Sequence, residues 1–279
     1  PMLLTLNASC LRPLIAPSGR KKPEIDLLDL PVMTRDQLGL AGVNLTTDLL
    51  AGADRTRLSR FRERADKAGC ACLLLIEPEA QPFGSPEITD IENATARMLR
   101  VVEAAQILGC SAASVCVQAK DDDEVLSDVA SHLRPVVERA EKLDLNLLVS
   151  PMPGLTERPE RVTELIKRVG GFRIGTFPDF ETASKQKDPS AYLHRLTPYA
   201  TVVSASTVAF AGEKPKAKGK AKAAKEPLPE DEGILPHDAY DLRAMLEALD
   251  SVGYGGPLAL DSRGDGDVTI GVIRSRDAL

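Results

Sequence analysis

The strongest constraint on this chain is a regular alternation between short apolar runs and segments with helical spacing. Buried strands are predicted at residues 3–7, 42–47, 70–76, 113–117, 145–150, 174–177, 201–206 and 258–260. Helices are predicted at residues 54–68, 88–108, 121–143, 158–169, 189–196 and 238–252, because apolar residues recur there at helical intervals. Strands that alternate with helices in this way form parallel sheets. The pattern therefore indicates the α/β class.

The number of predicted strands favours a closed barrel. Eight strands in a chain of 279 residues suit a (β/α)₈ barrel, also called a TIM barrel, which typically takes about 250 residues. We therefore expect a single domain over residues 1–279. An open doubly wound sheet is the alternative, because periodicity does not reveal closure. Its nucleotide-binding form is disfavoured, since no Gly-x-Gly-x-x-Gly or Gly-x-x-x-x-Gly-Lys pattern follows an early strand.

Composition excludes several classes of protein. The net charge is −6, which gives no general reason to expect nucleic-acid binding. No apolar run approaches the ~20 residues that span a membrane, and the first residues lack the pattern of a signal peptide. A cytoplasmic protein is therefore expected. The five cysteines are interpreted as reduced thiols, because none forms a Cys-x-x-Cys motif.

One segment departs from the alternation. Residues 213–226 are rich in Lys, with six Lys and no acid between Lys214 and Lys225. Such a segment cannot bury a core and is predicted to be a disordered insertion between the seventh strand and its following helix. The simpler interpretation is a solvated insertion. The alternative is a cationic flap that contacts an anionic ligand or partner.

The stretch RIGTFPDF at residues 173–180 shows where a binding site would lie. Pro178 has no N–H for a sheet, so the strand should end there and leave Asp179 at its carboxyl end. Barrels hold their ligands at this end of the strands. The polar residues expected around this pocket are Asn7, Thr46 or Thr47, Glu77, Gln118, Ser150, Asp179, Ser204 or Ser206, Asp261 and Arg263.

Several of these residues also have purely structural interpretations. Asp179 can cap the following turn, Asp261 can pair with Arg263, and Glu77 can be solvated. Ser150 and Ser204 can be small polar fillers. The three histidines, at positions 132, 194 and 237, fall within or at the start of predicted helices, where surface or capping roles are expected.

The second half of the chain resembles the sugar phosphate isomerase/epimerase family of xylose isomerase-like barrels, which includes the endonuclease IV type. The resemblance rests on NLLVSPMPGLT at 146–156, RIGTFPDF at 173–180, PYATVVSAS at 198–206 and GYGGPLALD at 253–261. It extends from about residue 99 to the C-terminus, and the first hundred residues match more loosely. It implies the barrel fold and activity on, or binding of, a small sugar or polyol.

The resemblance also implies a divalent metal, Mn²⁺, Zn²⁺ or Mg²⁺, held by a Glu, an Asp, a His and a Glu from the last four strands. At those positions this chain has Ser150, Asp179, Ser204 and Asp261. Two Asp with Ser hydroxyls offer little charge and no imidazole to a cation, so no bound metal or other cofactor is expected.

The resemblance and the residues together leave two main hypotheses. In the first, an isomerase or epimerase with a largely lost metal site uses Asp179, Asp261 and Glu77 as catalytic residues. Its substrate would be held by Asn7, Gln118, Ser150, Ser204 and Arg263. In the second, a non-catalytic barrel (a pseudoenzyme) binds a sugar-like ligand or a protein at the same mouth. Endonuclease activity is a weaker third hypothesis that only the Lys-rich segment favours.

Overall fold

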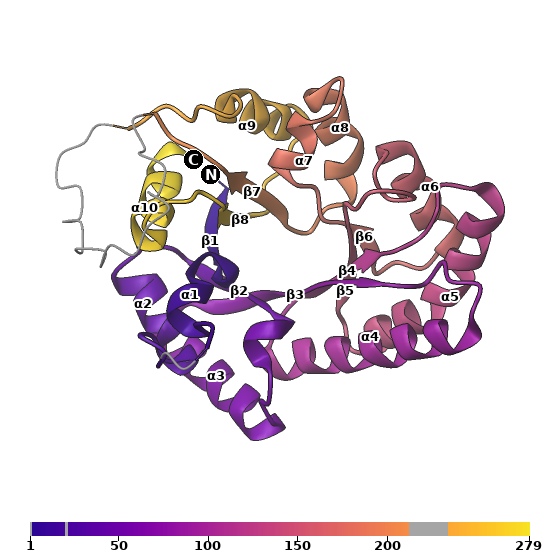
Figure 1. The fold of residues 1–279 in the computed structure, drawn as a ribbon, viewed down its shortest axis with the longest axis horizontal. Coiled ribbons are helices and arrows are strands. Elements are labelled where there is room, and N and C mark those ends of the chain that lie inside the picture. The colour runs from indigo at the N-terminus through magenta and orange to yellow at the C-terminus, as the bar shows by residue number, and fades with distance from the viewer. Residues whose placement is uncertain (1, 20–21, 212–233) are drawn as a thin grey trace.

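The eight predicted strands are all present and form one parallel sheet (Figure 1). The computed structural model describes residues 2–19, 22–211 and 234–279. The strand order is β6-β5-β4-β3-β2-β1-β8-β7. The strands are β1 (Leu3–Asn7), β2 (Gly42–Thr46), β3 (Ala71–Gln81), β4 (Ala112–Val117), β5 (Asn146–Ser150), β6 (Ile174–Thr176), β7 (Val203–Thr207) and β8 (Pro257–Ser262).

The two end strands of this sheet meet, which closes the barrel. Single bridges join Thr176 to Ala200 and Asp179 to Ser204. The Ser204 N–H also donates to the Pro178 carbonyl at 2.8 Å. The expectation of a (β/α)₈ barrel is confirmed, and the open sheet is excluded.

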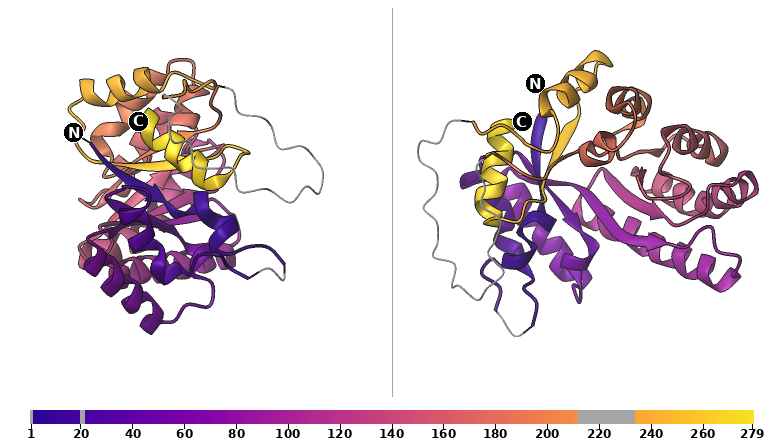
Figure 2. Two further views of the ribbon diagram at one scale, coloured as in Figure 1. Left: turned by 90° about the vertical axis from the view of Figure 1, so that its left-hand side faces the viewer. Right: turned by 45° about the horizontal axis from the view of Figure 1, so that its top comes forward.

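Helices cover the outer face of the sheet (Figures 1 and 2). They are α1 (Arg12–Ile15), α2 (Leu30–Asp36), α3 (Arg55–Ala68), α4 (Ile88–Leu108), α5 (Asp123–Lys142), α6 (Pro159–Val169), α7 (Phe180–Ser184), α8 (Pro189–Leu196), α9 (Leu242–Ser251) and α10 (Val268–Ala278). The helix starts follow the sequence signals, since Asp54 and Asp122 cap α3 and α5. Helix α10 had no predicted counterpart.

Apolar side chains fill two separate layers. The larger cluster lies between the sheet and the helices. A smaller cluster fills the inside of the barrel and consists of Leu74, Ile76, Ala112, Leu148, Phe177, Val202 and Ala259. Because side chains alternate along a strand, this smaller cluster identifies which positions of each strand face the lumen.

Strand β3 differs from its predicted course. It was expected to end before Pro78, but it continues to Gln81. Its register with β4 shifts between Ile76 and Ala80, so the residues between them form a bulge. Proline is tolerated at a bulge because its missing N–H is not needed for the sheet there.

The Lys-rich segment at 213–226 lies outside the described residues. The chain on either side of it forms a short antiparallel pair, in which the Ala211 N–H donates to the Pro236 carbonyl at 3.0 Å. His237 was expected at a helix start, but α9 begins at Leu242 with Asp241 as its cap. The His237 side chain instead lies beside the segment after β7, where its Nε2 accepts the Val208 N–H at 2.9 Å. Over the described part of the chain, no helix is both long and apolar enough to cross a membrane.

Candidate functional site

Strand register shows which predicted site residues face the barrel lumen. Laterally paired residues of a parallel sheet point to the same side. Ser114 pairs with Ile76 and Leu148, which belong to the lumen cluster. Ser150 lies two residues beyond Leu148, and Asp261 lies two residues beyond Ala259. By the same alternation, the lumen-facing positions also include Asn7, Asn44, Thr46, Asp179, Ser204 and Ser206.

Asp179 has both a structural and a site-forming role. Its Oδ1 accepts the Thr182 N–H at 2.8 Å and so caps α7. Its Oδ2 accepts the Ser204 hydroxyl at 2.8 Å, across the junction between β6 and β7. The side chain is only 6% exposed. The capping interpretation is therefore correct, and the same carboxylate also faces the mouth.

Arg263 is the centre of the charged cluster at the mouth. Its Nε donates to Asp261 Oδ2 at 2.8 Å, and its Nη2 lies 2.7 Å from the same oxygen. Nη2 also donates to Asp179 Oδ2 at 2.6 Å, while Nη1 donates to Asp179 Oδ1 at 3.2 Å and to Glu181 Oε2 at 2.6 Å. A guanidinium has five N–H donors. The hydrogen bonds use four of them.

The cluster controls the charge state of its members. Burial by itself would raise the pKa of Asp179, but the charge and hydrogen bonds of Arg263, with the bonds from Thr182 and Ser204, lower it overall. Burial would lower the pKa of Arg263, but Asp179 and Asp261 raise it. The hydrogen bond from Lys185, followed by that from Arg263, lowers the pKa of Glu181. At neutral pH Asp179 and Glu181 are therefore carboxylates beside the guanidinium of Arg263.

Glu77 lies apart from this cluster. It follows lumen-facing Ile76 by one residue, so it points toward the helices, where Arg97 of α4 donates from Nε to Glu77 Oε2 at 2.8 Å. Thr47 donates to Glu77 Oε1 at 3.1 Å. The Glu77 side chain is 0% exposed, so the interpretation as a solvated residue is wrong. The structure does not bring Glu77 together with Asp179 and Asp261.

The other predicted residues occupy varied positions. Asn7 is buried and accepts the Ser9 N–H at 3.3 Å through Oδ1, so it caps the turn after β1. Gln118 is exposed just beyond β4. Ser150 is buried and lies beside Cys116 in the register of β4 and β5. Burial raises the pKa of the Cys116 thiol, which keeps it protonated at neutral pH.

Two lumen-facing polar residues, Asn44 and Ser114, were not among the residues predicted to line the pocket with Thr46 and Ser150. The hydroxyls of Thr46 and Ser114 and the amide oxygen Oδ1 of Asn44 are buried and have no hydrogen-bond partner among the described residues, and the buried Ser150 hydroxyl has the neighbouring Cys116 thiol. They lie on β2, β4 and β5, on the far side of the lumen from Arg263 in strand order. Strand alternation from Ser150 and Thr46 was the signal that could have found Ser114 and Asn44.

The residues at the mouth do not fit the divalent metal that the resemblance implies. Nη2 of Arg263 lies 2.6 Å from Asp179 Oδ2 and 2.7 Å from Asp261 Oδ2. It therefore occupies the place that a cation bound by both carboxylates would take. In the described ranges, no three His, Cys, Asp or Glu side chains are grouped so that they could hold a metal ion. A guanidinium and a cation cannot occupy the same space, and their charges repel.

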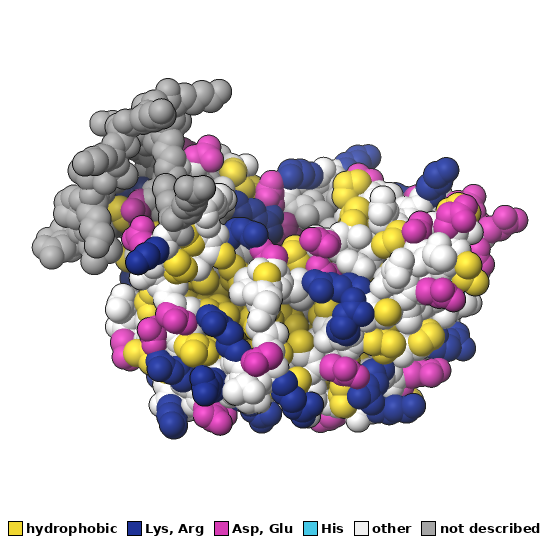
Figure 3. Space-filling view, turned by 60° about the horizontal axis from the view of Figure 1, so that its bottom comes forward, with side chains coloured by type: hydrophobic (Ala, Val, Ile, Leu, Met, Phe, Trp, Pro, Cys, Tyr) yellow, Lys and Arg dark blue, Asp and Glu magenta, His cyan; other side chains and the backbone are white. Residues whose placement is uncertain are grey.

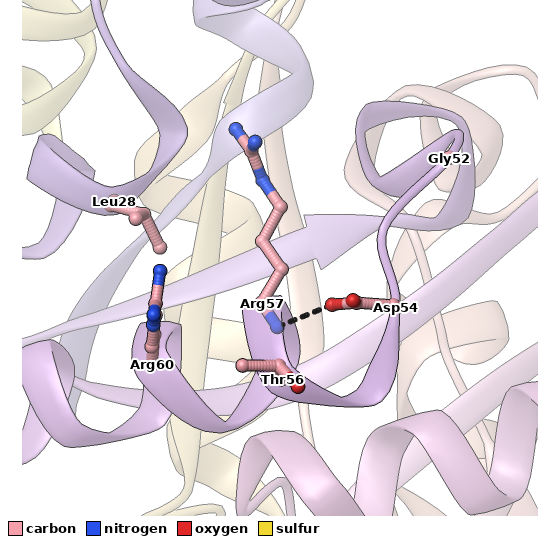
Figure 4. A pocket seen from close by; sticks show the side chains of 6 residues that line it. All are labelled: Leu28, Gly52, Asp54, Thr56, Arg57 and Arg60. Atoms are coloured by element: carbon pink, nitrogen blue, oxygen red, sulfur yellow. Dashed lines mark hydrogen bonds between the residues drawn. The ribbon is translucent and has the colours of Figure 1, made fainter.

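Two surface features put the mouth in context. On one face of the molecule, hydrophobic side chains gather in a central hollow with charged side chains at its border (Figure 3). A separate hollow of about 440 Å³ lies at the start of α3 and is lined by Leu28, Gly52, Asp54, Thr56, Arg57 and Arg60 (Figure 4). Asp54 Oδ1 already accepts the Arg57 N–H there. None of the predicted site residues lines this second hollow.

Comparison with known proteins gives one family. The family described as "Xylose isomerase-like TIM barrel" matches residues 36–277. No curated protein matches the sequence. Among solved structures, L-ribulose 3-epimerase superimposes with a TM-score of 0.72 at 12% identity, over 100% of this chain and 92% of that one.

Two further solved structures are similar over nearly their whole length. The 3-keto-D-glucoside 4-epimerase YcjR from E. coli has a TM-score of 0.69 at 12% identity and covers 98% of this chain and 97% of its own. AP endonuclease, family 2, from Brucella melitensis has a TM-score of 0.66 at 15% identity, over 98% of this chain and 97% of that one. At such identities the likeness concerns the fold.

Proposed function

Because the chain belongs to the xylose isomerase-like TIM barrel family, we propose that it binds a small neutral sugar or polyol in the mouth of the barrel. The observation that carries this proposal is the set of buried polar atoms without partners on Asn44, Thr46 and Ser114. A buried polar group without a hydrogen bond costs about 1–3 kcal/mol. A ligand with several hydroxyls supplies donors and acceptors to such a set, and this complementarity favours binding.

The charges at the mouth favour a neutral ligand over a phosphate ester. Three carboxylates, Asp179, Glu181 and Asp261, surround the guanidinium of Arg263, and four of its five N–H donors already serve them. An anionic group would meet these carboxylates there and few free donors. A hydroxyl group can accept or donate a hydrogen bond without this repulsion.

The same contacts favour binding over proton transfer. A general base needs a carboxylate that is free to take a proton at the working pH. Asp179 and Asp261 are held by Arg263, and Glu77 is held by Arg97. Lowering the pKa of Asp179 makes it a weaker base. The second hypothesis from the sequence, a non-catalytic ligand-binding barrel, is therefore the form of the proposal that we favour.

The first test is a binding survey in the presence of EDTA. A panel of free ketoses, aldoses and polyols, each paired with its phosphate ester, is titrated into the purified protein by calorimetry. We expect saturable binding of at least one free sugar or polyol, with its phosphate ester at least tenfold weaker. Failure of the whole panel, or binding of phosphate esters alone, would contradict the proposal.

Thr46 and Thr5 provide a matched pair of variants. Both are buried and face the lumen, but only Thr5 has partners: its hydroxyl donates to the Leu258 carbonyl at 3.1 Å and accepts Asn44 Nδ2 at 2.9 Å. Thr46→Val should weaken ligand binding about tenfold and leave the stability of the free protein unchanged or raise it by about 1 kcal/mol. Thr5→Val should lower that stability by about 1–2 kcal/mol.

The stability readout also distinguishes a ligand from structural water. If bound water satisfies the Thr46 hydroxyl, Thr46→Val will destabilise the free protein as Thr5→Val does and leave the calorimetric binding constant unchanged. Urea unfolding of both variants without ligand measures this directly. That combination of results would remove the main support for the proposed site.

A further inference from the structure

The geometry points to Arg263 as a fixed internal cation: we infer that its guanidinium takes the place of a divalent metal at the mouth of the barrel. Nη2 lies 2.6 Å from Asp179 Oδ2 and 2.7 Å from Asp261 Oδ2, so one positively charged atom joins the acids of β6 and β8. These separations are close to the 2.0–2.6 Å at which carboxylate oxygens bind Mg²⁺ or Ca²⁺.

Arg263 is the cation around which the cluster is arranged, and the two aspartates need no second cation. The side chains of Asp179 and Asp261 are 6% and 11% exposed, so each needs a permanent countercharge. Arg263 supplies it to both, and Glu181 adds a third carboxylate at Nη1. Asp261 also receives weak contacts from Ser9 and Cys10, at 3.4 and 3.5 Å to Oδ1. An arginine cannot be lost to solvent or to a chelator, whereas a metal can.

The position of Arg263 follows from strand alternation. It lies two residues beyond Asp261 and four beyond Ala259, on the lumen side of the chain that leaves β8. The Arg263 N–H donates to the Thr207 carbonyl at 2.8 Å, which holds this segment beside β7. The backbone is thus fixed, and the side chain reaches back over the two acids. This inference does not depend on the ligand-binding proposal.

The inference predicts that removal of the guanidinium creates a metal site. Arg263→Ala and the milder Arg263→Gln leave Asp179 and Asp261 without a countercharge, while Glu181 keeps its contact with Lys185, so either variant should gain binding of Mn²⁺ or Zn²⁺. Binding is measured by elemental analysis after gel filtration and by thermal unfolding with 1 mM metal. We expect about one metal per chain and a rise in Tm of about 5 °C for these variants, with neither for the wild type.

Two controls separate this effect from a general loosening of the barrel. Arg263→Lys keeps a positive charge near the two aspartates and should not gain metal. Arg97→Ala removes the arginine partner of the buried Glu77 but leaves only this one carboxylate, so it should lose stability without gaining metal.

Three results would overturn the inference. They are stoichiometric metal in the wild type, no metal in a folded Arg263→Ala or Arg263→Gln variant, and failure of both variants to fold even with metal present. Variants that fold only when Mn²⁺ or Zn²⁺ is added would support it. Sugar binding by the wild type in EDTA is measured separately, so the two proposals can fail independently.

Discussion

Glu77 and Asp179 look alike in the sequence but have different surroundings in the barrel. Each is an acid beside a proline where the sequence predicts the end of a strand, and each is buried and paired with an arginine. Glu77 follows lumen-facing Ile76 by one residue and faces α4, whereas Asp179 follows Phe177 by two and faces the lumen. A strand end places a side chain near the mouth, but the alternation of side chains along the strand decides which side of the sheet it faces.

The two arginines differ in the same way. Arg97 donates through Nε to the single carboxylate of Glu77, and the contact ties α4 to the end of β3. Arg263 is shared among three carboxylates from β6, α7 and β8. We therefore expect the Glu77–Arg97 pair to serve stability alone, and the Asp179–Arg263 cluster to define the properties of the mouth.

The largest expected effect tests the structural role of the first pair. Arg97→Met leaves the fully buried Glu77 carboxylate without a countercharge and should lower the free energy of unfolding by about 3–5 kcal/mol. The double variant Glu77→Met/Arg97→Met replaces both partners by apolar side chains and should recover most of this loss. Urea unfolding measures both variants. If the double variant were stable but lost ligand binding, Glu77 would belong with the mouth after all.

The acid dependence of stability tests the charge state of Asp179. Its pKa is lower in the folded protein than the ordinary value of about 3.9, so the unfolded chain binds the proton more readily. The stabilisation is complete above the ordinary pKa and is lost as the pH falls through the lower, folded value. Asp179→Asn should lower the free energy of unfolding at pH 7. It should also reduce the fall of this free energy toward acid pH, which we call the acid limb.

Urea unfolding between pH 7 and pH 2.5 measures the limb. Asp265→Asn, at an exposed position after β8, is the control and should follow the wild-type curve. An acid limb as steep in Asp179→Asn as in the wild type would show that other carboxylates cause it.

The smallest expected effect concerns the rim of the cluster. The Glu181 side chain is 25% exposed and contacts Lys185, which is 68% exposed, as well as Arg263. Exposed ion pairs contribute little, so Glu181→Gln should cost less than about 1 kcal/mol. A loss of more than about 2 kcal/mol of unfolding free energy in the same urea experiment would show that Glu181 is as important for stability as the two aspartates.

The barrel and most of its helices and strands can be predicted from the sequence alone. Apolar runs of strand length, separated by capped amphipathic segments, specify a parallel sheet covered by helices, and the structure confirms each predicted strand. The sequence also identified Asp179, Asp261 and Arg263 as residues at strand ends. These features are local, because they depend on spacing along the chain.

The contacts among Asp179, Asp261 and Arg263 as a cluster are visible only in the tertiary structure. Asp179 and Arg263 are 84 positions apart, and nothing in their spacing shows that one guanidinium reaches three carboxylates. The bulge after Ile76 and the turn of Glu77 toward Arg97 also depend on packing of α4 against β3. The pairing of Asp261 with Arg263 is local and was anticipated from the sequence, whereas the contact of Asp179 with Arg263 joins distant segments and depends on sheet closure, where β6 and β7 meet.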